Sequence, residues 1–142
     1  MVEMMKYVVA YLAAVITLFA VDLVWLGIVA KSFYREQIGP LMLDEINILA
    51  AVLFYALYVV GVVIFAVSPA LHTGSWRTAI ILGALFGFFA YATYDMTNLA
   101  TLRGWPIAMV VVDIAWGTFL TAISASAGFL VTHRFFPASG VT

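Results

Sequence analysis

Three aspartates, Asp22, Asp95 and Asp113, stand in segments that are otherwise apolar enough to cross a membrane. Placing a carboxylate in hydrocarbon costs roughly 2.5–3.5 kcal/mol on insertion scales. The chain has only 6 basic and 7 acidic residues, so these three are a large part of its acidic charge. An ionisable residue inside a membrane segment marks a functional site by default. We therefore take the three aspartates as candidate catalytic residues.

Three carboxylates gathered at one depth cannot all stay ionised without a compensating charge. One solution is a proton, because a neutral carboxylic acid beside a carboxylate forms an acid–base pair. The other is a hard divalent cation such as Mg²⁺, Ca²⁺ or Mn²⁺, which prefers oxygen ligands. The residues that would hold such a cation are Asp22, Asp95, Asn98 and Asp113. No cofactor follows with certainty, and both solutions stay open.

The composition indicates an integral membrane protein. The chain is 66% hydrophobic and only 9% charged, whereas an ordinary soluble domain is roughly 25% charged. A soluble domain of 142 residues could not bury so much apolar surface. The net charge of −1 gives no basic field for nucleic acid, so the expected partner is the lipid bilayer. The absence of cysteine excludes disulfides, thiolate metal sites and cysteine nucleophiles.

Apolar helices must position these aspartates, and four segments reach the roughly 20 residues that cross the hydrocarbon. The predicted helices cover about residues 7–30, 43–67, 76–102 and 107–131. A polar stretch from residue 31 to Pro40 follows the first helix, and Ser68-Pro69 ends the second. Asp44 and Glu45 are expected in the first turn of the second helix, at the positive end of its dipole.

No linker is long enough to separate domains, so residues 1–142 are expected to form a single transmembrane domain. The predicted fold class is all-α: an integral membrane four-helix bundle with antiparallel up-down topology and both termini on the same side. In this topology the three aspartates lie roughly 10 Å from the surface opposite the termini. Asn47 opens the second helix from that surface. Every helix therefore brings a polar group to one layer.

Helical spacing places the polar groups on faces that suit helix packing. The third helix carries one stripe of small and polar residues, and the fourth carries another: Gly83, Gly87, Tyr91, Asp95 and Asn98, then Asp113, Gly117, Thr121, Ser124 and Gly128. A Gly-x-x-x-Gly spacing is often packing alone. The candidate ligand-binding residues share the aspartate layer: Trp25, Asn47, Tyr91, Tyr94, Asn98 and Trp116.

Two motifs in the chain repeat the pattern Asp-x-x-Trp, one from Asp22 to Trp25 and one from Asp113 to Trp116. The first lies late in its helix and the second lies early, so the two helices run antiparallel through the same layer. The alternative for the aspartates is a structural role, and Arg103 could hold Asp95 in an ion pair. The two histidines are expected at the opposite membrane edge, too far away to join the carboxylates.

A fairly specific pattern runs through the second half of the chain: Tyr-Asp-Met-Thr-Asn at 94–98, Trp-Pro at 105–106 and Asp-Ile-Ala-Trp-Gly at 113–117. It resembles the signature of a bacterial family of small membrane proteins known as domain of unknown function 2177. The resemblance covers most of the chain, including Asp22 and Trp25. It implies a four-helix protein of the bacterial cytoplasmic membrane and supplies no mechanism.

Three functions fit these residues, and we rank them in this order. The first is an intramembrane enzyme or binding protein for a lipid-like or isoprenoid molecule. The second is an accessory subunit of a larger membrane complex, and the third is a proton- or cation-coupled transporter, which needs access from both sides. The chain could also form a homo-oligomer. The expected numbers of Lys and Arg residues on the two sides of the membrane are equal, so the positive-inside rule gives no orientation. The acidic residues gather on the side opposite the termini, which favours cytoplasmic termini.

Overall fold

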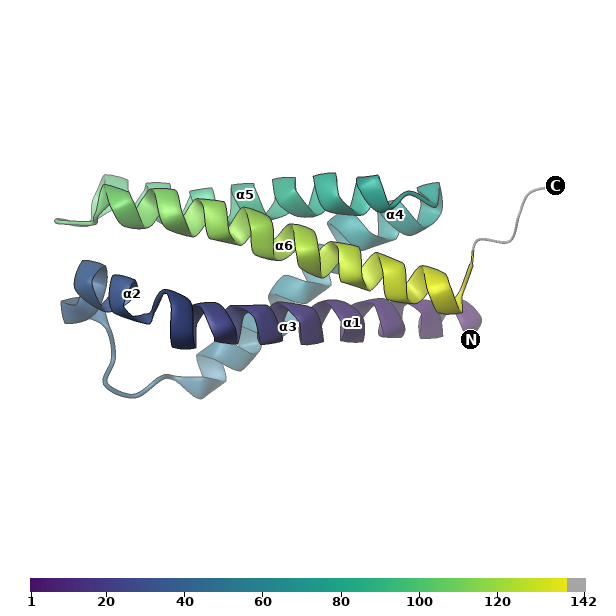
Figure 1. The fold of residues 1–142 in the computed structure, drawn as a ribbon, viewed down its shortest axis with the longest axis horizontal. Coiled ribbons are helices and arrows are strands. Elements are labelled where there is room, and N and C mark those ends of the chain that lie inside the picture. Colours follow the sequence, from purple (N-terminus) through teal and green to yellow (C-terminus); the bar gives the residue numbers. More distant parts are fainter. Residues whose placement is uncertain (138–142) are drawn as a thin grey trace.

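The computed structural model describes residues 1–137, and this range is helical with no strand. Four helical segments are long and apolar enough to cross a membrane: Val2–Val29, Ile48–Thr73, Trp76–Thr101 and Ile107–Phe135. They run up and down in turn, so that the N-terminus and the last turn of the fourth segment lie at the same end (Figure 1). The predicted all-α membrane bundle is confirmed.

The first segment consists of α1 (Val2–Val24) and a π-helical turn, Trp25–Val29. It begins five residues before the predicted start at residue 7, with Glu3 in its first turn, where the helix dipole favours a carboxylate. The polar stretch that follows contains a short helix, α2 (Lys31–Ile38), and a 3-10 turn at Gly39–Leu41. The expected connection is therefore itself helical.

The second segment begins at Ile48, later than the predicted residue 43, because Asn47 caps it. The Asn47 side-chain oxygen accepts a hydrogen bond from the Ala50 backbone nitrogen at 3.1 Å. The expectation that Asp44 and Glu45 form the first turn is therefore wrong, since both precede the cap in the loop.

The predicted end of the second segment at residue 67 is also wrong. Helix α3 (Ile48–Val62) continues through a π-helical turn, Val63–Val67, into α4 (Ser68–Thr73). Pro69 is tolerated because it stands in the first turn of α4. The segment ends at Gly74, whose φ of 63° is the left-handed conformation that favours glycine.

The third and fourth segments are the uninterrupted helices α5 (Trp76–Thr101) and α6 (Ile107–Phe135). Helix α5 matches its predicted range to within one residue, and α6 extends four residues beyond the predicted end at residue 131. Gly104, with φ of 73°, makes the turn between them. Helix α6 packs against both α5 and α1, so it is the central helix of the bundle (Figure 1).

Glycines allow α5 and α6 to approach closely. A Cβ added to Gly87 would lie 2.3 Å from the Gly117 backbone oxygen and 2.6 Å from the Thr121 hydroxyl. A Cβ on Gly83 would lie 2.8 Å from that of Ala125. Real Cβ atoms do not come so close to their neighbours, so the Gly-x-x-x-Gly spacing serves helix packing here.

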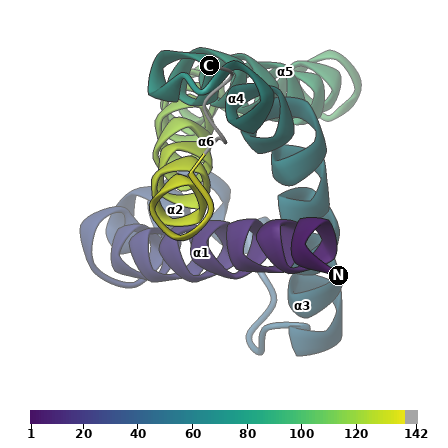
Figure 2. The same cartoon turned by 90° about the vertical axis from the view of Figure 1, so that its right-hand side faces the viewer.

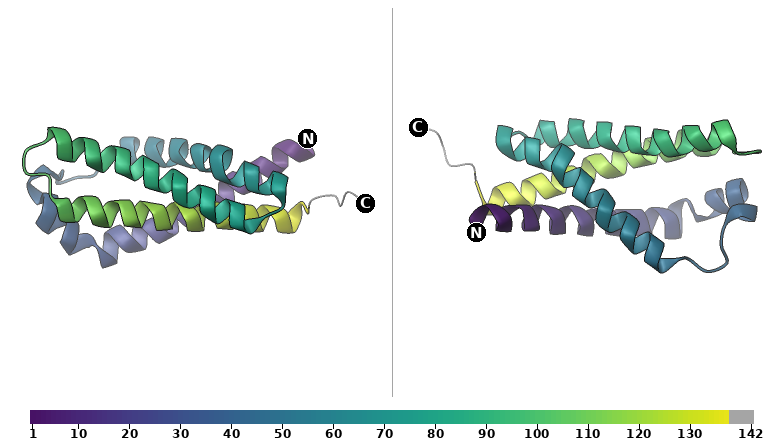
Figure 3. Two further views of the ribbon diagram at one scale, coloured as in Figure 1. Left: turned by 90° about the horizontal axis from the view of Figure 1, so that it is seen from above. Right: turned by 180° about the vertical axis from the view of Figure 1, so that it is seen from behind.

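Helix α3 crosses the bundle obliquely, as the end view and the rear view show (Figures 2 and 3). Its early part lies beyond α1, on the side away from α5 (Figure 2). Its continuation through Val63–Val67 and α4 packs against α5. Helices α3 and α5 therefore diverge toward the end of the bundle that is opposite the termini.

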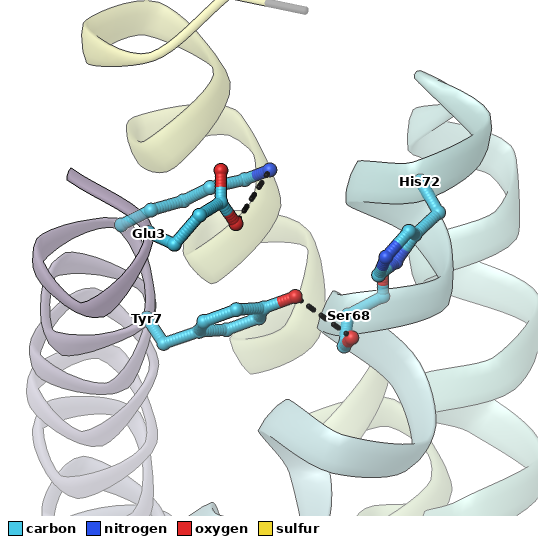
Figure 4. Close-up of polar contacts among 5 residues, drawn as sticks. Glu3, Tyr7, Ser68 and His72 are labelled. Carbon is cyan, nitrogen blue, oxygen red and sulfur yellow. Dashed lines mark hydrogen bonds and ion pairs between the residues drawn. The ribbon is translucent and has the colours of Figure 1, made fainter. Parts of the chain in front are cut away.

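The terminus end of the bundle is closed by small side chains and by a polar contact between helices. Ala10, Ala66 and Ala70 are fully buried there. The hydroxyl groups of Tyr7 on α1 and Ser68 on α4 are hydrogen-bonded at 3.3 Å (Figure 4). The bundle is therefore tight at one end and splayed at the other.

Candidate functional site

Asp22, in the last turn of α1, is buried and hydrogen-bonded through both carboxylate oxygens. Its Oδ2 accepts a hydrogen bond from the Tyr55 hydroxyl at 2.5 Å, and its Oδ1 accepts one from the Trp116 indole nitrogen at 3.0 Å. Tyr55 belongs to α3 and Trp116 to α6. One carboxylate therefore joins three membrane-spanning segments.

Asp95 and Asp113 form a second carboxyl site, where α5 and α6 meet. Asp113 is 7% exposed, and its Oδ1 accepts a hydrogen bond from the Tyr34 hydroxyl. The Asp95 carboxyl group lies beside that of Asp113 and near the Trp105 indole, and it is 0% exposed. Among residues 1–137, neither Asp95 oxygen has a hydrogen-bond partner while both carboxyl groups are ionised, and Trp105 Nε1 has none. A proton held between Asp95 and Asp113 would join the two carboxyl groups.

The two carboxyl sites are connected through a pair of stacked indoles. The rings of Trp25 and Trp116 lie 4.1 Å apart between centroids, with 8° between their planes. Trp116 donates to Asp22, whereas Trp25 donates through its Nε1 to the Tyr34 hydroxyl at 3.4 Å. The tryptophan of the second Asp-x-x-Trp motif thus binds the aspartate of the first. The repeat in the sequence corresponds to a crossed pair in space.

Tyr34 on α2 is a site residue that the sequence analysis missed. It reaches Asp113 because α2 packs its apolar side chains, Phe33, Tyr34 and Ile38, on a cluster that includes Trp105 and Met109. Burial, and then the hydrogen bond to Asp113, raise the pKa of Tyr34, so it stays a protonated donor. The i, i+4 spacing of Tyr34 and Ile38 places both side chains on one face of a helix, and this pattern could have indicated that the polar stretch packs on the bundle.

A cavity of about 340 Å³ opens beside Asp113, between α3, α5 and α6. Its lining consists of one carboxyl group and apolar or aromatic side chains: Phe54, Tyr58, Ala90, Tyr91, Tyr94 and Asp113. It occupies the place where α3 and α5 diverge. The Tyr58 hydroxyl is paired with Thr121 Oγ1 at 2.7 Å.

The predicted ligand-binding residues fall into three groups. Tyr91 and Tyr94 line the cavity. Trp25 and Trp116 form the stacked pair between the two carboxyl sites. The remaining two residues do not line the cavity: Asn47 is exposed and caps α3, and Asn98 is partly buried one turn beyond Tyr94.

The four oxygen-bearing residues proposed for a hard cation do not form one ligand cluster. Within the described range, no three His, Asp or Glu side chains are arranged to hold a metal ion. Both carboxylate oxygens of Asp22 instead accept hydrogen bonds from side-chain donors. We therefore derive no chemistry through a metal.

The alternative of an ion pair between Arg103 and Asp95 is not found in the described part of the chain, whose one ion pair is Lys6–Glu3 at 4.0 Å (Figure 4). His72 lies at the terminus end, where its Nδ1 is 2.7 Å from the Ser68 carbonyl oxygen. It therefore lies apart from the carboxyl sites, as expected.

The model of one protein family matches the chain over residues 7–130 and describes its members as a predicted membrane protein, domain of unknown function 2177. No curated protein and no solved structure matches the chain. The matched range contains all three aspartates, both stacked tryptophans and every residue that lines the cavity.

Proposed function

The chain belongs to this family of predicted membrane proteins, and from that premise we propose that it binds a lipid-like or isoprenoid molecule inside the membrane. The polar head of the ligand contacts Asp113, and its apolar part lies against the aromatic side chains of α3 and α5. Asp95, behind Asp113, completes a carboxyl pair that can exchange a proton with the bound head.

The observation that carries this proposal is the cavity beside Asp113. Its volume of about 340 Å³ lies in the range of roughly 300–1,000 Å³ that is typical of small-molecule sites. Such sites are mostly apolar with a few polar groups that orient the ligand, and five of the six lining side chains here are aromatic or aliphatic. The cavity also lies within the membrane-spanning segments.

The state of Asp95 supports a role beyond packing. A buried polar group without a hydrogen-bond partner is rare in native structures and calls for a reason. Two adjacent carboxyl groups repel each other unless they share a proton. A protonated acid beside a carboxylate can give and take a proton, which is the requirement for acid–base catalysis.

The transporter hypothesis has less support from the packing. A transporter needs access to its site from both sides of the membrane. On the terminus side of the carboxyl layer, the core contains fully buried alanine and valine side chains, among them Ala14, Val59 and Val62. The accessory-subunit hypothesis stays open, and the following experiment separates it from ligand binding.

The test is native mass spectrometry of the chain released gently from its membrane. We expect a bound amphiphile that is lost in Ala90→Phe, because the larger side chain fills the cavity. Ala100→Phe is the matched control, since Ala100 is exposed on the same helix and does not line the cavity. Equal ligand content in the two variants, or a copurifying protein in place of a ligand, contradicts the proposal.

For the orientation, we propose cytoplasmic termini. The acidic residues Glu36, Asp44 and Glu45 lie at the opposite end of the bundle, together with α2. This places the carboxyl pair nearer the outer surface of the membrane. A reporter fused after Thr142 tests the orientation, and a signal outside the cytoplasm contradicts it.

A further inference from the structure

The polar atoms at the cavity suggest what kind of head group it accepts. Asp113 is more than nine-tenths buried, and its Oδ1 is occupied by Tyr34. No donor other than the proton shared with Asp95 reaches its Oδ2 among residues 1–137, so this oxygen keeps a lone pair for a ligand, and the residue lines the cavity. Asp113 therefore offers the ligand one hydrogen-bond acceptor.

Tyr91 adds a hydrogen-bond donor to the same cavity. Its ring is held against Gly117, where an added Cβ would lie 2.2 Å from the ring atoms. The Tyr91 hydroxyl has no hydrogen-bond partner in the described range, whereas the Tyr58 hydroxyl is paired with Thr121. The cavity thus combines one free acceptor with one free donor, both fixed on packed helices.

We propose that the ligand is a neutral lipid alcohol, whose hydroxyl group donates to Asp113 and accepts from Tyr91. This inference rests on the proposed function and specifies the substrate class of that site. A hydroxyl group has both a donor and acceptor lone pairs, so it satisfies both partners at once. A protonated amine is attracted by the carboxyl pair, but it must lose its hydration to enter an apolar cavity. Because it has donors only, it would also leave the proton of the Tyr91 hydroxyl without an acceptor.

Anionic heads are disfavoured by the same carboxyl pair. A phosphate or carboxylate head would bring negative charge next to Asp113 and Asp95, and charges interact strongly where water is scarce. Among the described residues, no Lys, Arg or His lines the cavity to compensate. The site therefore selects against phosphorylated lipids and fatty acids by repulsion as well as selecting for an alcohol.

The experiment uses photoreactive probes that share one dodecyl tail and differ in the head: alcohol, amine, phosphate, carboxylate or a plain methyl end. The full-length chain is reconstituted in nanodiscs, and labelling of the α5 peptide that contains Tyr91 is quantified by mass spectrometry. We expect the alcohol to label at least about tenfold more than the phosphate or carboxylate. Competition with unlabelled prenols and unlabelled monoacylglycerols distinguishes the two sources of a lipid hydroxyl.

Single substitutions test the two hydrogen bonds separately from folding. Tyr91→Phe should reduce labelling by the alcohol several-fold and leave labelling by the methyl-ended probe unchanged. Tyr7→Phe is the matched control, because its hydroxyl lies at the terminus end (Figure 4). Asp113→Asn should narrow the difference in labelling between the alcohol probe and the phosphate probe, since it removes the charge that repels the phosphate.

The possible outcomes separate this inference from the proposed function. If every probe labels the Ala90→Phe variant as strongly as it labels the natural chain, the cavity binds no ligand and the proposed function fails. If labelling depends on the cavity, but the amine, phosphate or carboxylate probe labels the protein as much as the alcohol probe or more, the site stands and the inference is overturned. Unchanged alcohol labelling in Tyr91→Phe also overturns it.

Discussion

Asp22 and Asp95 are both buried aspartates in membrane-spanning helices, but their carboxyl groups have opposite surroundings. Asp22 accepts hydrogen bonds through both oxygens, from Tyr55 and Trp116. Neither oxygen of Asp95 has a hydrogen-bond partner within the described residues, and its neighbour is another carboxyl group. The first carboxylate ties helices together, whereas the second lies behind a cavity.

The difference shows how to separate a structural aspartate from a functional one in a membrane bundle. A carboxylate that accepts hydrogen bonds from several helices contributes to stability. A buried carboxyl group without partners lowers stability, so its presence requires another explanation. The Asp95–Asp113 pair, and not Asp22, is therefore the part of the aspartate layer to test for activity.

The largest expected effect comes from one substitution made at both places. Asp22→Asn should lower the free energy of unfolding by about 1–3 kcal/mol, because the amide cannot accept from both donors. Asp95→Asn should leave the free energy of unfolding unchanged or raise it, since no donor on another helix loses its acceptor and the amide can donate to Asp113 in place of the shared proton. Circular dichroism during unfolding by SDS in mixed micelles measures both. Equal destabilisation by the two substitutions contradicts the division of roles.

A slightly smaller effect is expected from a methyl group placed behind the cavity. Gly117→Ala should destabilise the protein by about 1–2 kcal/mol and displace the Tyr91 ring, because the new Cβ meets that ring. Gly27→Ala is the matched control, since nothing lies within 4 Å of its added Cβ. Thermal unfolding in detergent measures stability, and labelling by the alcohol probe measures the cavity. Equal stability and equal labelling of the two variants would mean that Gly117 does not position Tyr91.

A double-mutant cycle tests whether the stacked indoles link the two carboxyl sites. Trp116→Phe removes the bond to Asp22, and Tyr34→Phe removes the bond to Asp113. Because Trp25 contacts both partners, we expect a coupling energy of about 0.5–1 kcal/mol. Trp116→Phe combined with the distant Tyr7→Phe should be additive. Additivity in both cycles would show that the carboxyl sites are independent.

The smallest effect is a change in the pH dependence of stability. The pKa of Tyr34 is raised by burial and by its hydrogen bond to Asp113, whereas an unfolded tyrosine titrates near pH 10. The stability from Tyr34 is present below about pH 10 and is lost as the pH rises from there toward the folded pKa. Tyr34→Phe should reduce the alkaline slope of the unfolding free energy by about one proton. Identical slopes for the two proteins would contradict this.

Much of the framework was predictable because it depends on local patterns. Apolar length sets the spans, and the four-residue spacing of Gly83, Gly87 and Tyr91 sets the α5 face that packs on α6. The common depth expected for the three aspartates follows from counting residues to the helix ends. These features require only the geometry of a helix.

The division of roles within the aspartate layer could not be predicted, because it depends on tertiary contacts. The π-helical turn at Trp25–Val29 changes the helical register just after Asp22. Tyr34 reaches Asp113 only because α2 folds back onto α6, which eight residues of mixed polarity do not indicate. Likewise, the sequence offers both the acidic pair and Asn47 as the beginning of α3, and only the hydrogen bond from the Ala50 backbone nitrogen to Asn47 identifies the cap.

The oblique course of α3 has a consequence for how occupancy of the site is set. Phe54 and Tyr94, at the edge of the cavity, are 46% and 52% exposed. Because both belong to segments that are long and apolar enough to cross a membrane, this surface would face hydrocarbon there. The proposed ligand would then enter sideways from the bilayer without passing through water. The quantity that governs binding of such a ligand is its mole fraction in the membrane. The dissociation constant should therefore be constant when it is expressed as a mole fraction, and the apparent constant in bulk molar units should rise in proportion to the bulk lipid concentration.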